Sequence, residues 1–159
     1  MQNNDYIAVL KQGLEKKIQI LDQIVSKNFI QKQLLADPEL TPAEFEKNIT
    51  QKAELVEQLI ELDRGFEQVY ARVKEELMQN RSLYVADIAQ MQKCIATIME
   101  KSTQVQAQEQ RNKELIIQKF ASVKKQIREV KSSKNAVDQY YRNMMKLNYV
   151  DPQFLDNKK

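Results

Sequence analysis

The chain has 159 residues and a formal net charge of +3, with 30% charged and 42% hydrophobic residues. These values suit a single folded domain and exclude a membrane-spanning composition or a typical disordered chain. With two glycines, three prolines and no histidine, the composition disfavours turn-rich β folds, phosphate-binding glycine loops and histidine-based catalysis or metal binding.

The expected localisation follows from the absence of targeting, membrane-spanning and disulfide-forming features in this sequence. The N-terminal residues show no basic segment followed by an apolar one, and no apolar run approaches the ~20 residues that span a bilayer. The single cysteine, Cys94, cannot form an internal disulfide, which favours a reducing compartment. We therefore expect a soluble, cytoplasmic protein without direct membrane insertion.

The first predicted helix covers residues 5–33. Its apolar residues recur at three- and four-residue steps, interrupted by Lys17, and further apolar side chains widen the stripe. A face this broad is expected to contact two neighbouring helices. The stripe consists of Ile7, Leu10, Leu14, Leu21 and Ile24, widened by Ile18, Val25 and Phe29. A linker with Pro38 and Pro42 follows this helix.

The second predicted helix covers residues 42–79 and has the clearest start. Thr41 is an N-cap residue, Pro42 takes the first helical position, and Glu44 completes a capping box. Gly65 interrupts the helix, and we expect it to permit close approach of a neighbouring helix or a mild bend. The apolar seam steps by four and three through Leu55, Leu59, Leu62, Phe66, Val69 and Val73.

The third predicted helix covers residues 82–130, because no proline or glycine interrupts this stretch. Ser102, Glu109 and Asn112 fall within its apolar seam, and polar residues at such positions set the register of packed helices. The seam slips by one residue near Phe120. A helix of this length measures roughly 75 Å, more than either of the first two helices.

Short connections between the three helices predict an elongated antiparallel three-helix bundle or coiled coil. The start of the second helix is then expected opposite residues 117–120, so that the third helix overhangs beyond Val123. The apolar stripe continues on this overhang through Ile127 and Val130 without an internal partner. Exposed apolar stripes often mark interaction surfaces.

Charge is unevenly distributed along the chain. Residues 37–79 contain 11 acidic and 5 basic residues, and residues 111–134 contain 8 basic and 2 acidic residues. The basic block is expected to receive an acidic partner, to contact nucleic acid, or to form a solvated face, and the pattern leaves all three open.

Residues 131–159 form a second unit, an amphipathic tail beside a bundle of residues 1–130. Its tyrosines and methionines are typical of an adaptable binding face, although the tail is equally suited to fold back and complete the core. We expect Lys124, Lys125 and Arg128 to steer acidic partners. The candidate partner-binding residues are Val123, Ile127, Val130, Val137, Tyr140, Tyr141, Met144 and Met145.

Residues 46–66, which contain the sequence Leu62-Asp63-Arg64-Gly65-Phe66, resemble a segment of the FlgN family of flagellar type III export chaperones. Residues 111–116, 140–144 and 151–156 are similar to the third helix and tail of that family. The FliT-like chaperones are a close alternative. The resemblance implies a cytoplasmic chaperone without catalytic or metal-binding residues or cofactors, which binds C-terminal helices of hook–filament junction proteins or the filament cap protein and delivers them to an export-gate membrane protein.

The amphipathic pattern favours the same type of function, since a helical bundle can accept a client helix as an extra member. We expect no enzyme activity, because no carboxylate pair or other group has a catalytic pattern. The main alternative is a structural or adaptor coiled-coil protein that homodimerises through the same stripe, and the pattern does not distinguish a monomer from a homodimer. A nucleic-acid binder is a weaker alternative, so our expectation is that nucleic acid is not a partner.

Overall fold

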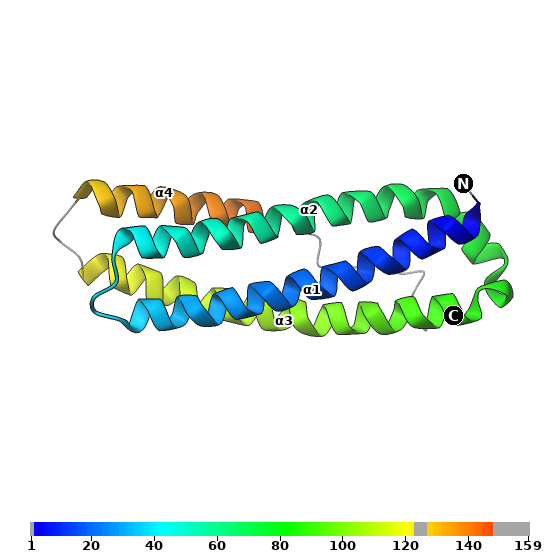
Figure 1. Ribbon diagram of the computed structural model, residues 1–159, viewed down its shortest axis with the longest axis horizontal. Helices are drawn as coiled ribbons and strands as arrows, with labels where there is room; N and C mark the ends of the chain where they lie inside the picture. Colours follow the sequence, from blue (N-terminus) through cyan, green and yellow to red (C-terminus); the bar gives the residue numbers. More distant parts are fainter. Residues whose placement is uncertain (1, 123–126, 148–159) are drawn as a thin grey trace.

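The computed structural model describes residues 2–122 and 127–147, apart from the side chains of 122 and 127–130. The described residues are predominantly helical and contain no strand, which confirms the all-α helical bundle. The helices lie side by side as a long rod (Figure 1). The elements are α1 (Asn3–Ala36), α2 (Pro42–Gln79), the 3-10 turn η1 (Arg81–Leu83), α3 (Val85–Ser122) and α4 (Ile127–Met144).

The start of α2 has the predicted cap. The Glu44 backbone N–H donates to Thr41 Oγ1 at 3.2 Å, and the Glu44 carboxylate accepts from the Thr41 backbone N–H at 3.4 Å. Pro42 occupies the first helical position, where its missing N–H costs nothing. The predicted bounds 42–79 are those of α2.

The first three helices run antiparallel, with α1 packed against both α2 and α3 (Figure 1). The rings of Phe45, near the start of α2, and Phe120, near the end of α3, meet edge to face with centroids 5.8 Å apart. This contact confirms the predicted alignment of the start of the second helix with residues 117–120.

The long overhang of the third helix was a wrong prediction. Helix α3 ends at Ser122, and the helix that begins at Ile127 is a separate element, α4, which lies alongside α2 (Figure 1). Residues 127–130 therefore belong to α4 and do not extend α3. The one-residue slip in the apolar seam lies near the end of α3.

Helix α4 adds a fourth member to half of the bundle. Its buried residues Ser133, Val137, Tyr140 and Met144 recur at steps of four, three and four, which defines one face of a helix. The Ser133 hydroxyl donates to Glu46 Oε1 of α2 at 3.0 Å. Part of the predicted client-binding tail thus completes the core, which is the second of the two expectations for this segment.

The half of the rod near η1 has three helices and a mostly apolar core. Its buried polar residues include Lys17, whose ammonium pairs with Asp63 Oδ1 at 2.7 Å. Gly65 lies in this half, and a Cβ atom built on it meets nothing within 4 Å, so the predicted close approach of a neighbour was wrong. The core side chains include Ile7, Leu10, Leu14, Val73, Leu77, Ile88, Met91 and Ile95.

Candidate functional site

A layer of polar side chains crosses the four-helix half of the bundle. At its centre, the Lys52 ammonium of α2 pairs with Glu109 Oε1 of α3 at 2.6 Å and donates to Gln31 Oε1 of α1 at 3.0 Å. The Lys52 side chain has no exposed surface and that of Glu109 is 7% exposed. A buried charge is tolerated only with such compensation, so each partner depends on the other.

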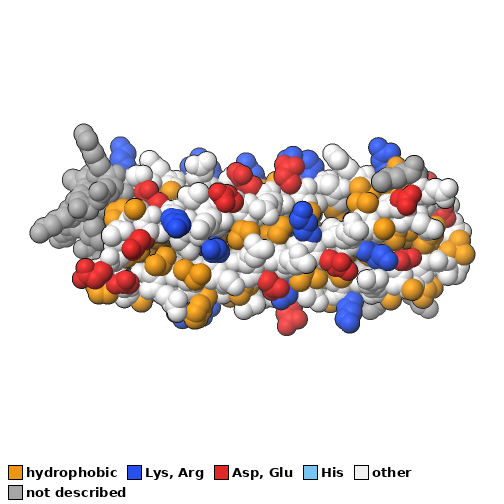
Figure 2. Space-filling view, viewed as in Figure 1, with side chains coloured by type: hydrophobic (Ala, Val, Ile, Leu, Met, Phe, Trp, Pro, Cys, Tyr) orange, Lys and Arg blue, Asp and Glu red, His pale blue; other side chains and the backbone are white. Residues whose placement is uncertain are grey.

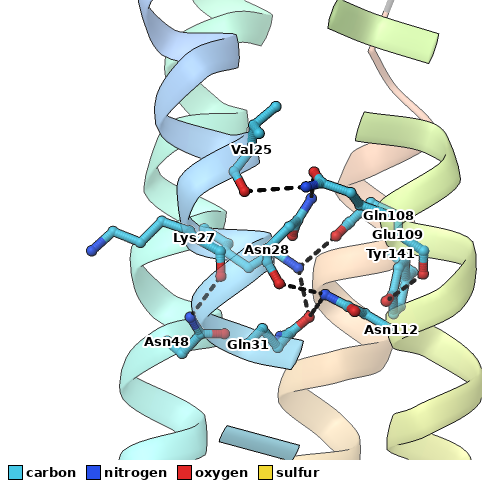
Figure 3. A network of polar contacts seen from close by, with 10 residues as sticks. Val25, Lys27, Asn28, Gln31, Asn48, Gln108, Glu109, Asn112 and Tyr141 are labelled. Atoms are coloured by element: carbon cyan, nitrogen blue, oxygen red, sulfur yellow. Dashed lines mark hydrogen bonds and ion pairs between the residues drawn. The ribbon is translucent and has the colours of Figure 1, made fainter. Parts of the chain in front are cut away.

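Amide side chains extend this layer between α1 and α3 (Figure 3). Asn112 Nδ2 donates to Gln31 Oε1 and to the Asn28 carbonyl, both at 3.0 Å. The Asn28 amide donates to Gln108 Oε1 at 3.2 Å, and Gln108 returns a bond to the Val25 carbonyl at 3.3 Å. These bonds satisfy part of the hydrogen-bonding capacity of the buried amides, while Asn28 Oδ1 and Gln31 Nε2 have no partner within the described residues.

The fourth helix contributes aromatic contacts to the same layer. The Lys52 ammonium lies 4.4 Å from the Tyr140 ring centroid, a cation–π contact that adds compensation from α4. The Tyr141 hydroxyl donates to the Glu109 carbonyl at 3.4 Å, and the Lys113 ammonium lies 5.3 Å from the Tyr141 ring centroid. Side chains from all four helices therefore meet in this polar layer.

The electrostatics of the polar layer follow from burial. Burial lowers the pKa of Lys52, and the adjacent Glu109 carboxylate partly opposes this by favouring the ammonium form. Burial also raises the pKa of Tyr141, and Glu109 adds to the effect because a phenolate would face a carboxylate. The layer therefore keeps Tyr141 neutral as a hydrogen-bond donor.

The polar residues predicted to set register do face the core, since Ser102, Glu109 and Asn112 are all buried. Sequence analysis missed their partners Gln31 and Lys52. A signal was present, because the apolar seams of both helices continue through polar residues at the same steps. The α1 seam runs through Ile24, Asn28, Gln31 and Leu35, and the α2 seam runs through Asn48, Lys52, Leu55 and Leu59.

A groove of about 450 Å³ lies between α3 and α4, lined by residues of these two helices and by Met145, which directly follows α4. Ile116 and Phe120 of α3 and Val137 of α4 are among its apolar residues. Two further lining side chains are largely exposed, Ile117 at 60% and Met145 at 85%. An open groove between two helices with exposed apolar walls is suited to receiving an amphipathic helix.

Charged side chains border this α3–α4 groove. Lys134, Asp138 and Arg142 of α4 line it on one side, and Lys113 lines it on the α3 side. Elsewhere on the rod, acidic and basic side chains are interspersed over the part of the face that described residues form in Figure 2. The groove therefore combines an apolar lining with charges of both signs.

The structure separates the predicted partner-binding residues into two groups. Tyr141 and Met145 line the α3–α4 groove, and Val137 both lines it and packs in the core. Tyr140 and Met144 are buried, and the Tyr140 ring lies against Lys52 of α2, so in this conformation they are core residues and not a partner surface.

The remaining predicted site residues are not placed by side chain. Val123, Lys124 and Lys125 lie outside the described residues. Ile127, Arg128 and Val130 belong to α4, and their side chains also lie outside the described part.

The α3 wall of the groove, especially Ile117, was not predicted from the sequence. An apolar residue directly after the seam residue Ile116, on an exposed face, was the available signal.

Among the described residues, no cluster of three or more histidine, cysteine, aspartate or glutamate side chains is placed to hold a metal ion. None of the described helices combines the length and apolar character that crossing a membrane requires. Cys94 is half-buried, and burial raises its pKa. Comparison of the chain with known protein families, curated proteins and solved structures finds no match.

Proposed function

We propose that this chain is a cytoplasmic export chaperone that holds an amphipathic helix of a client protein in the α3–α4 groove. The observation that supports this function is the apolar groove itself, with Ile117 and Met145 exposed on its walls. A client helix that covers these side chains removes apolar surface from water on both partners. The same contact hides the client's own apolar stripe and so prevents premature assembly. The proposed role is binding without catalysis.

The resemblance of residues 46–66 to the FlgN family supports a more specific version of the proposal. The clients are then the C-terminal helices of hook–filament junction proteins, or the filament cap protein in a FliT-like chaperone. The chaperone carries them to the membrane protein of the type III export gate. A small groove suits this role, because contacts of limited area are strong enough to protect a helix and weak enough to be exchanged.

The alternative function is a structural or adaptor coiled-coil protein. In this case the α3–α4 groove would be covered by a second copy of the chain. The exposed side chains Ile117 and Met145 favour both functions equally, so the experiment has to separate a client from a second copy.

The test is co-expression of the full chain with each junction protein and with the cap protein, followed by size-exclusion chromatography with light scattering. The groove variant carries Ile117→Asp and Met145→Asp. Leu83→Asp with Val85→Asp is the matched control, because these residues are 72% and 64% exposed at the opposite end of the rod. Both variants add two carboxylates at exposed apolar positions, and circular dichroism checks that both remain helical.

We expect a 1:1 complex with one client that the groove variant loses and the control variant keeps. A complex that survives in both variants would contradict the groove as the binding site. A homodimer that forms without any client, and that the groove variant dissociates, would replace the chaperone with the structural coiled coil.

A further inference from the structure

The α4 side of the groove carries a regular charge pattern. Lys134, Asp138 and Arg142 are four residues apart, so they lie on one face of the helix, and all three line the groove and are exposed. No ion pair joins these three side chains to one another in the described structure. A basic–acidic–basic row therefore faces the groove with its charges available to a partner.

The α3 side of the groove differs from this charged row. Ile116, Ile117 and Phe120 make this side apolar, and Lys113 stands at one end, over the ring of Tyr141. An occupant therefore meets the apolar residues of α3, together with Val137 and Tyr141 of α4, and the charged row of α4 beside them. An amphipathic helix fits this division, because its apolar stripe and its flanking charges lie side by side.

We propose that the α3–α4 groove selects a client helix whose flanking charges run acidic, basic, acidic at four-residue spacing, an inference that rests on the proposed function. Two helices packed side by side rise equally per residue, so charges four apart on one meet charges four apart on the other. The outer acidic residues of the client pair with Lys134 and Arg142, and its central basic residue pairs with Asp138. The pattern reads the same from both ends and therefore suits parallel and antiparallel clients alike.

This pattern is more selective than a general preference for acidic helices. A helix with three acidic residues would place a carboxylate against Asp138, and a helix with the opposite pattern would meet like charge at all three positions. Like charges across an interface suppress wrong partners, while complementary charges accelerate encounter. The charged row thus provides specificity, and the apolar side of the groove provides most of the affinity.

The test uses two fluorescein-labelled synthetic peptides of equal length with the same leucine stripe. One carries Glu-Lys-Glu and the other Lys-Glu-Lys at four-residue spacing beside that stripe, and binding to the full chain is measured by fluorescence anisotropy. Since exposed pairs are individually weak and are screened by salt, we expect the first peptide to bind roughly five- to tenfold more tightly at low ionic strength. This preference should decrease in high salt. Circular dichroism checks that both peptides are equally helical.

Protein variants then locate the source of the preference. The charge-reversed variant K134E/D138K/R142E is expected to prefer the Lys-Glu-Lys peptide. A milder variant, Asp138→Asn, leaves the helix surface polar. It is expected to reduce the difference in affinity between the two peptides without reversing it. If the reversed variant still prefers the Glu-Lys-Glu peptide, the selection arises elsewhere and the inference is overturned.

The same measurements separate this inference from the proposed function. Suppose that both peptides bind the original chain equally well, and that the variant with Ile117→Asp and Met145→Asp binds neither. The groove then binds helices but does not discriminate between them by charge. If that variant binds both peptides as tightly as the original chain, the groove is not the site and the proposed function is overturned together with the inference.

Discussion

The half of the rod near η1 and the half near the α1–α2 turn have cores of different chemistry. Near η1, three helices enclose apolar side chains such as Leu10, Val73 and Met91. Near the α1–α2 turn, α4 adds a fourth helix, and the side chains buried there include Gln31 and Lys52. The half with more helices is therefore the one with the more polar core.

This difference shows how specificity and stability are divided between the two halves. An apolar core stabilises a bundle without defining register closely, because leucine and isoleucine pack in several alignments. The polar layer tolerates few alignments, since each displaced partner leaves a buried polar group unpaired. We infer that the three-helix half supplies much of the stability, while the polar layer determines how α4 docks and thereby shapes the α3–α4 groove.

The largest expected effect on stability comes from removing the central charge of the polar layer, which tests whether this half depends on its buried ion pair. Lys52→Met leaves the Glu109 carboxylate buried without its counter-charge and removes the contacts to Gln31 and Tyr140. We expect a loss of about 3–5 kcal/mol in the free energy of unfolding, measured by urea denaturation.

The control for this change is the double variant Lys52→Met with Glu109→Leu. It removes both charges and should recover most of the lost stability, because a buried pair and an apolar replacement are often of similar stability. A single variant that loses less than about 1 kcal/mol would contradict a dry, mutually dependent pair.

The two halves should also respond differently to alkaline pH. Above about pH 10 the unfolded chain loses the Tyr141 phenol proton. The folded chain retains it because burial raises the pKa of this group. The folded state then binds more protons, so stability falls as pH rises. Lys52 has the opposite sign, since its pKa is lowered by burial and its contribution to stability rises with pH up to its ordinary value of 10.5.

Tyr141→Phe isolates the tyrosine contribution. We expect the original chain to lose up to about 1.4 kcal/mol per pH unit more than this variant above pH 10, measured by urea denaturation between pH 8 and 11.5. Tyr70→Phe is the comparison variant in the three-helix half, where burial raises the pKa of the phenol. Equal alkaline losses in the two variants would show that the polar layer holds the Tyr141 proton no more tightly than the three-helix half holds that of Tyr70.

Local signals made much of the fold predictable. The start of α2 depends on Thr41, Pro42 and Glu44, which are adjacent in sequence and act through bonds within one turn. The end of α3 was not predicted, because neither proline nor glycine marks it and the apolar seam of the sequence continues past it after a slip of one residue near Phe120. The docking of α4 on α2 depends on contacts between distant parts of the chain.

The candidate site was partly predictable for the same reason. Tyr141 and Met145 were predicted from the amphipathic pattern of the tail and its tyrosines and methionines, and they do line the groove. Lys52 was missed because a lysine on an amphipathic helix ordinarily faces water. Its burial depends on Glu109 and Tyr140, which lie far away in the sequence. Extending each apolar seam through polar residues at the same spacing would have revealed it.

The smallest expected effect on stability comes from a glycine substitution in the three-helix half. Gly65 lies inside α2, and a Cβ atom there meets nothing within 4 Å. Gly65→Ala should therefore raise the free energy of unfolding by about 0.5–1 kcal/mol, because alanine loses less backbone entropy in a helix and introduces no clash. Gly13→Ala in α1, which has equally open surroundings, is the matched control and should give a similar gain. A loss of stability at Gly65 but not at Gly13 would mean that α2 needs a bend in this half, so that its packing is less regular than its apolar core suggests.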